Sequence, residues 1–380
     1  MALTAGIVGL PNVGKSTLFN AITKAGALAA NYPFATIDPN VGIVEVPDSR
    51  LIKLEEMVQP KKTIPTTFEF TDIAGIVKGA SKGEGLGNKF LSHIREVDAI
   101  CQVVRAFDDE NVTHVSGRVN PLDDIEVINM ELVLADLESV EKRLPKIEKM
   151  ARQKDKTAEM ELRILTQIKE ALEDGKPVRS IDFNEDDQKW VNQAQLLTSK
   201  KMLYIANVGE DEIGDKDNDK VKAIREYAAN EDSEVIVISA KIEEEIATLD
   251  DEDKEMFLED LGIEEPGLDR LIRTTYDLLG LSTYFTAGVQ EVRAWTFKQG
   301  MTAPQCAGII HTDFERGFIR AEVTSYEDYV QHGGENGAKE AGRQRLEGKD
   351  YIMQDGDIVH FRFNEHVFIL MRHSKIRSKF

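Results

Sequence analysis

The residues best placed to do chemistry lie near the start of the chain, in the sequence GLPNVGKST. Gly9 is followed by four residues and then by Gly14, Lys15 and Ser16, and the run stands between a predicted strand and a predicted helix. Glycines in such a loop allow main-chain N–H groups to close around phosphates, and the start of the helix adds a positive partial charge. The spacing therefore predicts a site for the phosphates of a nucleotide.

The side chains of this loop have separate expected roles. The Lys15 ammonium is expected to bind the β- and γ-phosphates and so to take part in catalysis, while the Ser16 hydroxyl binds Mg²⁺. Thr17 is expected to donate a hydrogen bond to the α-phosphate. The other expected nucleotide-binding positions of the loop are Asn12, Val13 and Gly14.

Two further segments supply candidate metal ligands and a γ-phosphate contact. Asp72 ends the predicted strand TTFEFTD, where a carboxylate can hold Mg²⁺ through water, and the N–H of Gly75 can contact the γ-phosphate. Thr36, in NYPFATIDPN, is the candidate threonine that joins the Mg²⁺ shell only when the γ-phosphate is present. The glycines after Gly75 are typical of a surface loop or of a second mobile switch, and we favour the switch.

The residue after Gly75 bears on the hydrolysis step. Many phosphate-loop hydrolases have a Gln there that orients the attacking water, but this chain has Ile76, which offers no hydrogen bond. His114 is the candidate replacement, because it lies in a polar loop after the predicted strand AICQVVRAF, and such loops border the ligand crevice of a parallel sheet. A surface histidine without a catalytic role is the alternative.

The sequence IANVGEDE concerns the base of the nucleotide. Guanine-specific proteins with this phosphate loop use Asn-Lys-x-Asp, but here Asn207 is followed by Val208, a glycine and Glu210. The Lys stem and the Asp carboxylate that recognise guanine are both missing, so discrimination in favour of guanine is expected to be weak. The Asn207 amide can serve the 6-amino group and N7 of adenine. A second loop, ISAK, resembles the last base-flanking loop of proteins with this phosphate loop, and that resemblance implies that Ser239 and Ala240 belong to the base site.

The elements that must position these residues alternate along the first part of the chain. Short apolar runs alternate with helical patterns, which predicts an α/β fold with a mainly parallel sheet and helices on both faces. Apolar residues then recur at spacings of three and four from Val127 to Met150, through Met130 and Leu134, and again from Leu162 to Leu172. These two stripes predict an antiparallel helical hairpin inserted in the α/β domain.

The expected domain boundaries follow from these patterns. Residues 1–125 and 200–280 are expected to form the nucleotide-binding domain, and 126–199 the inserted coiled-coil-like domain. Residues 281–364 read as short strands and turns with a helix, a small α+β domain. Residues 365–380 are expected to be a flexible tail or a remnant of an expression vector.

Composition limits the kinds of partner. The chain has 380 residues and a formal net charge of −21, which argues against DNA binding and against non-specific nucleic-acid binding by the whole surface. No run of about 18 apolar residues occurs, so no membrane partner is expected. The N-terminus lacks the basic region of a signal peptide, and Cys101 and Cys306 fit a reducing compartment, so we expect a cytoplasmic protein. We also expect it to be a monomer.

One segment departs from the acidic balance. Residues 141–156, EKRLPKIEKMARQKDK, have a local excess of basic side chains at the far end of the predicted long helix. A solvated helix face explains such an excess without any partner. The segment is nevertheless the best candidate surface for RNA.

Several motifs together resemble the YchF family of Obg-like ATPases, which are translation-factor-type P-loop NTPases. They include GLPNVGKSTLFNAIT, DIAGIVKGASKGEGLGNKFL, HVSGRVNPLDDIEVIN, YIANVGEDE, YFTAGVQEVRAWT and IHTDFERGFIRAEV, and the resemblance covers residues 1–364. It implies a G domain with a helical insertion and a C-terminal TGS domain. In related GTPases an Asn at the place of Asn12 helps to hold K⁺ beside the phosphates. The alternative is that Asn12 is a simple turn residue.

The resemblance also implies an activity. The expected protein is a Mg²⁺-dependent ATPase with slow intrinsic turnover, which prefers ATP to GTP and associates with the ribosome or its RNA. The residues leave two alternatives open: a conventional GTPase with relaxed base specificity, and a ribosome- or RNA-binding scaffold in which hydrolysis is incidental.

Overall fold

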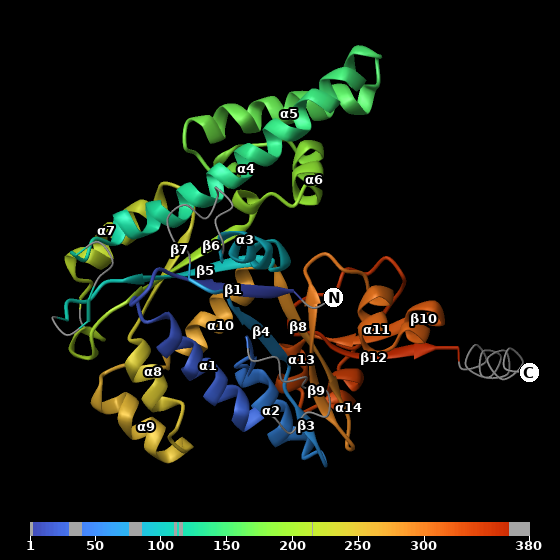
Figure 1. Cartoon of the computed structure of the whole chain (residues 1–380). Helices are drawn as coiled ribbons and strands as arrows, with labels where there is room; N and C mark the ends of the chain where they lie inside the picture. The colour runs from blue at the N-terminus through green and yellow to red at the C-terminus, as the bar shows by residue number, and fades with distance from the viewer. Residues whose placement is uncertain are drawn as a thin grey trace, which may run out of the picture. The chain divides into compact units, whose positions relative to one another are not determined.

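The computed structural model describes residues 3–29, 40–75, 86–109, 112–113, 117–214 and 216–364. The chain forms two compact units (Figure 1). The first unit comprises Met1–Val44 and Phe68–Thr275, and the second comprises Glu45–Thr67 and Tyr276–Phe380. No helix within the described ranges has the length and apolar character needed to cross a membrane.

A six-stranded sheet forms the centre of the first unit. Its strand order is β2-β4-β1-β5-β6-β7, and the pairs from β4 to β7 are parallel. The strands are β1 (Thr4–Val8), β2 (Val41–Glu45), β4 (Thr67–Asp72), β5 (Ala99–Arg105), β6 (Lys201–Asn207) and β7 (Glu234–Ile238). All of β5 is buried, as its apolar sequence predicts for a parallel strand covered on both faces.

Helices cover both faces of this sheet, which confirms the predicted α/β architecture. In Figure 1, α3, α4 and α7 lie on one side of the sheet, and α1, α8 and α10 lie on the other. The helices are α1 (Lys15–Ala29), α3 (Leu86–Glu96), α4 (Pro121–Arg152), α5 (Lys156–Glu173), α6 (Glu185–Gln193), α7 (Asp219–Ala229), α8 (Ala240–Ile246), α9 (Asp251–Asp260) and α10 (Gly267–Leu278).

Strand register gathers the candidate residues at one edge of the sheet. Asp72 pairs with Ile7, while Asn207 pairs with Arg105 on one side and with Ile238 on the other. The carboxyl ends of parallel strands meet at the same edge, so the loops that follow β1, β4, β5, β6 and β7 lie together there.

Helices α4 and α5 form the predicted hairpin, but the predicted stripe on α4 holds only in its outer half. There Val140 and Ile147 are buried against α5. In the inner half, Met130 and Leu134 are 46% and 40% exposed, and the residues buried in their place are Ile125, Ile128 and Leu132. The reason is a change of partner, because the inner half packs on β5 and α7.

The second unit is an α+β domain around another six-stranded sheet, of order β11-β10-β12-β8-β9-β3. Its strands are β3 (Thr63–Ile64), β8 (Leu281–Ala287), β9 (Val292–Lys298), β10 (Phe318–Thr324), β11 (Arg345–Glu347) and β12 (Ile358–Phe363). Its helices are α2 (Ser49–Val58), α11 (Ala303–Ile310), α12 (Thr312–Arg316), α13 (Tyr326–Gln331) and α14 (Glu335–Glu340).

Residues 45–67 differ from the expected boundary, which placed them with the nucleotide-binding domain. Strand β3 pairs in parallel with β9, and α2 buries Leu51 and Leu54 in a cluster with Phe285. The Arg50 guanidinium also donates to Asp355 at 2.7 Å. Both the strand pairing and the apolar packing therefore join this segment to the C-terminal unit.

Candidate nucleotide-binding site

A cavity of about 910 Å³ opens in the first unit at the carboxyl edge of its sheet. The loop after β1 supplies the predicted phosphate-binding residues, and the loops after β5, β6 and β7 supply the opposite walls. Nearly all the predicted positions line it: Asn12, Gly14, Lys15, Ser16, Thr17, Gly75, Asn207, Val208, Glu210, Ser239 and Ala240. Residues separated by more than 200 positions in the sequence thus line the same cavity.

The phosphate loop has the backbone that its sequence predicts. Gly14 has φ +97°, a conformation that costs little only for glycine, and Asn12 has φ +63°. Helix α1 begins at Lys15, directly after this turn, so the first N–H groups of the helix face the cavity region lined by Lys15, Ser16 and Thr17. Such an arrangement suits an anionic ligand.

Two predicted catalytic and metal-binding groups are in direct contact. The Lys15 ammonium forms an ion pair with the Asp72 carboxylate. The carboxylate and the Ser16 hydroxyl are hard oxygen donors of the kind Mg²⁺ prefers, and both lie at this phosphate-loop corner of the site. The donor set therefore fits Mg²⁺, which Ser16 and Asp72 would hold. Three predicted residues, Thr36, Ile76 and His114, lie outside the described residues.

Asn207 joins three loops through its side chain. Its Nδ2 donates to the main-chain oxygen of Val13 at 2.9 Å, and its Oδ1 accepts from the N–H of Ala240 at 2.9 Å. The side chain is buried, and a Cβ on Gly14 would lie only 2.1 Å from Nδ2. In the structure both of its polar atoms have main-chain partners, so the amide holds the phosphate loop against the base-side loops. That it also reads adenine stays a prediction.

The base-side loop itself is fixed by neighbouring polar groups. Glu212 accepts from the N–H of Gly209 at 3.0 Å and from Asn218 Nδ2 at 2.9 Å. Glu210 points to Lys241, with 2.8 Å between Oε2 and Nζ, and this hydrogen bond raises the pKa of the Lys241 ammonium. Glu210 is thus an exposed, charge-paired residue at the rim of the cavity.

Sequence reasoning placed the loop after β5 beside the crevice, through His114, but missed Arg105 and Phe107, which build this wall. Arg105 is fully buried, and its guanidinium donates to the main-chain oxygens of Phe107 and Val112 at 3.2 and 2.9 Å. Its Cζ also lies 4.5 Å from the centroid of the Phe107 ring, which lines the cavity. Asn12 Nδ2 donates to the oxygen of Thr113 at 3.0 Å and ties this wall to the phosphate loop. An arginine ending an apolar strand was the available signal, because a buried guanidinium must find acceptors.

Comparisons with known proteins agree with this geometry. A family model described as 50S ribosome-binding GTPase matches residues 4–161, and the YchF-GTPase C-terminal model, described as a protein of unknown function (DUF933), matches residues 281–364. The protein named Ribosome-binding ATPase YchF from Bacillus subtilis (strain 168) is 71% identical over 365 residues, which cover 96% of this chain and 100% of that protein.

Two further relatives extend the likeness to other organisms and to structure. The Ribosome-binding ATPase YchF of Escherichia coli O157:H7 is 56% identical over 96% of this chain and 100% of its own length. The solved structure of the Schizosaccharomyces pombe YchF GTPase is 40% identical, with a TM-score of 0.87 over 95% of this chain and 97% of that one. On its sequence, its fold and its phosphate loop, the chain belongs to the YchF family of Obg-like P-loop proteins.

Proposed function

We propose that this chain is a Mg²⁺-dependent ATPase of slow intrinsic turnover that prefers ATP to GTP and associates with the ribosome under the control of its nucleotide. The observation that carries the proposal is the cavity in which the phosphate loop and the base-side loops meet, with Asp72 held beside it by its ion pair with Lys15. The names of the relatives support both the ATPase activity and the association with the ribosome, since the proteins from Bacillus subtilis and Escherichia coli are called ribosome-binding ATPases.

The phosphate end of the cavity supports hydrolysis. Lys15 and the N–H groups at the start of α1 would bind the phosphates and stabilise the charge that develops on them. Bound Mg²⁺ would neutralise further charge on the phosphate oxygens. Gly75 lies beside the phosphate loop, since an added Cβ would be 3.5 Å from the oxygen of Gly9, and its N–H would contact the γ-phosphate. With Ile76 in the water-orienting position, His114 remains our candidate for that task.

The base end supports a preference for adenine. Phe107 and Val208 offer apolar surfaces to a purine ring, and the Glu210 carboxylate is paired with Lys241. A guanine would find no Lys stem and no Asp carboxylate at the positions that usually recognise it. Its N1–H and 2-amino groups would lose those partners, whereas adenine has neither donor to satisfy.

Binding of ATP and GTP tests this base preference. We expect ATP to bind at least about tenfold more tightly than GTP, because a missing polar partner for a bound base costs this much or more. Isothermal titration calorimetry with non-hydrolysable analogues and Mg²⁺ measures both constants. Changing Val208→Lys together with Glu210→Asp should move the preference toward GTP. Equal or tighter binding of GTP by the unaltered chain would favour a conventional GTPase instead.

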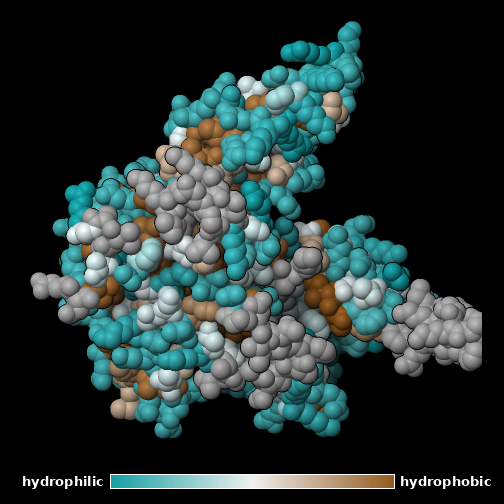
Figure 2. All heavy atoms as spheres, in the orientation of Figure 1, coloured by the Kyte–Doolittle hydropathy of each residue, from teal (hydrophilic) through white to brown (hydrophobic). Residues whose placement is uncertain are grey.

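The inserted hairpin supplies a surface for ribosomal RNA. At its far end Lys146, Lys149 and Arg152 are exposed, and none of them forms an ion pair with any described residue. Lys142 and Arg143, by contrast, are paired with Glu138 and Glu161. Figure 2 shows hydrophilic residues covering this end of the hairpin. Unpaired cations on an otherwise acidic chain are suited to contact phosphates.

Reversing these three charges should weaken ribosome association. In the variant Lys146→Glu, Lys149→Glu, Arg152→Glu, we expect co-sedimentation with ribosomes to fall about tenfold and to lose part of its salt dependence, because phosphate contacts release counterions. Intrinsic ATP hydrolysis should stay within about twofold, since the site is not touched. The matched control reverses Lys142, Lys169 and Lys189, whose ammonium groups already have carboxylate partners in the same inserted segment. Equal losses in both variants would show that net charge, and not the hairpin end, is responsible.

A further inference from the structure

The second unit contains a cavity that the nucleotide chemistry does not use. Its volume is about 490 Å³, and it lies beside strand β12, where the turn between β8 and β9 forms one wall. Helices α12, α13 and α14 each contribute a residue, namely Phe314, Tyr329 and Glu335. The cavity is therefore built from several elements of one sheet domain.

Strand β12 has an open edge at this cavity. On one side it pairs with β10 along its length, from Thr324 and Ile358 to Phe318 and Phe363. On the other side, within the described residues, it pairs with β8 through a single pair, Ile358 and Phe285. Main-chain groups alternate in direction along a strand, and the oxygen of Asp357 accepts from Phe285. The N–H and C=O groups of Phe361 and Phe363 therefore point toward the same open side.

The two faces of this edge differ in chemistry. On one face Phe361 and Phe363 line the cavity together with Trp295 and Phe314, and the rings of Phe314 and Phe363 stack with their centroids 3.9 Å apart. The Trp295 indole is held in place by a hydrogen bond from Nε1 to Thr286 at 2.9 Å. An apolar side chain that reaches this face would leave water for an aromatic surface.

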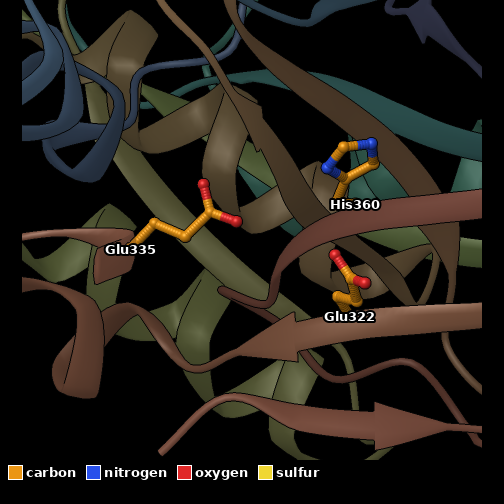
Figure 3. A group of neighbouring side chains, drawn as sticks. All are labelled: Glu322, Glu335 and His360. Carbon is orange, nitrogen blue, oxygen red and sulfur yellow. The ribbon is translucent and has the colours of Figure 1, made fainter. Parts of the chain in front are cut away.

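The other face is acidic where it borders the cavity, since Glu322 and Glu335 line the cavity, although Arg320 and Arg362 lie on the same face. His360 lies opposite Glu322 in the strand register, and Glu335 begins α14. One ligand atom from each of these three residues lies within 4.8 Å of the others, and Figure 3 shows the Glu335 carboxylate directed toward the other two side chains. Arg362 already binds both oxygens of Glu322, at 3.1 and 3.0 Å. Gln344 Nε2 donates to Glu335 at 3.3 Å, and among the described residues Glu335 forms no ion pair, so its negative charge is available to a basic ligand.

We propose that this cavity binds an extended peptide segment of a partner protein in which basic and apolar residues alternate. The peptide would add as a strand to the open edge of β12. Its main chain would form hydrogen bonds with the N–H and C=O groups of Phe361 and Phe363. Because side chains alternate across a strand, its apolar residues would face the aromatic wall and its Lys or Arg residues would face Glu335. A divalent metal ion fits less well, because it would have to displace Arg362 from both oxygens of Glu322.

Tryptophan fluorescence tests the proposal on the full chain. The chain has two tryptophans, so a Trp190→Phe background leaves Trp295 as the reporter in the cavity wall. The probe is the blocked peptide Lys-Ile-Arg-Ser-Lys-Phe, with the same residues in the order Lys-Lys-Ile-Phe-Arg-Ser as control. We expect the alternating peptide to shift the Trp295 emission with saturation, and the reordered peptide to bind at least about fivefold more weakly, because it cannot present one basic and one apolar face.

Charge reversal on helix α14 supplies the matched variants. Glu335→Lys should weaken binding of the alternating peptide by about fivefold or more, because it replaces an attraction with a repulsion. Glu340→Lys, on the same short helix but outside the cavity lining, should leave binding unchanged. Equal binding by both variants, or equal binding of the two peptides, would overturn the proposal.

Two other occupants would also overturn it. If Zn²⁺ or Mn²⁺ alone saturates the Trp295 signal and His360→Ala abolishes that response, the acidic face is a metal site. The alternating probe has the sequence of residues 375–380, which lie outside the described residues. If it binds only to a chain that ends at Asn364, the chain's own end and not a partner is the ligand.

Discussion

Replacing Gly14 with alanine is expected to lower the affinity for ATP by about 100-fold or more, because two strains act on the same residue. Gly14 has φ +97°, which is unfavourable for any residue with a Cβ. The new Cβ would also lie 2.1 Å from Nδ2 of Asn207, so either the phosphate loop or the Asn207 side chain must move. Both movements disturb the groups that surround the phosphates. Calorimetric titration with a non-hydrolysable ATP analogue measures the loss.

Gly262→Ala is the matched control for this substitution. Gly262 also has a positive φ, +67°, but it does not line the cavity, and an added Cβ there would meet nothing within 4 Å. We expect ATP affinity to change by no more than about threefold in this variant, within the range of a tolerated substitution. Thermal unfolding of both variants shows whether they are folded. Normal ATP binding by a folded Gly14→Ala variant would mean that the loop tolerates the strain.

The parts of the site that were predictable from sequence depend on local spacing. The run from Gly9 to Ser16 fixes a turn and a helix start within one short segment, so no distant contact is needed to recognise it. The position of Asp72 is also predictable from local sequence, because Asp72 ends a strand whose apolar and polar residues alternate. The structure places both where the sequence predicts.

The parts that were not predictable depend on partners far along the chain. The Asn207 amide binds main-chain groups of Val13 and Ala240, and nothing in the sequence around Asn207 shows that these two loops approach it. Strand β3 has only two residues, and its partner β9 is more than 220 positions away. Neither has a periodic pattern of its own that would reveal the pairing.

The long helix shows the same limit within a single element. Its stripe from Val127 to Met150 assumes one apolar face along the whole length, as for a hairpin packed on one partner. The helix in fact packs on the sheet domain at Ile125, Ile128 and Leu132, and on α5 farther out. A change of partner part-way along a helix rotates the buried face, and periodicity averaged over the helix conceals it.

Asn207→Ala should weaken binding of ATP and of GTP equally, by about 30-fold each, because it leaves the oxygen of Val13 and the N–H of Ala240 without a partner. An amide that holds loops together supports any purine nucleotide in the cavity. An amide that reads the 6-amino group and N7 of adenine would instead change the ratio of the two affinities. The measurement is therefore the pair of dissociation constants for ATP and GTP analogues, before and after the substitution.

The control for this last change is a buried amide elsewhere in the same unit. Asn129 donates to the hydroxyl oxygens of Tyr204 and Tyr227 and does not line the cavity. Asn129→Ala should lower the unfolding temperature without changing nucleotide affinity by more than about twofold, because distant sites act independently. If Asn207→Ala weakens ATP alone and spares GTP, the amide is a base reader after all. Equal loss for both nucleotides would place adenine selectivity in the walls of the cavity, around Phe107 and Val208, where the ring itself must pack.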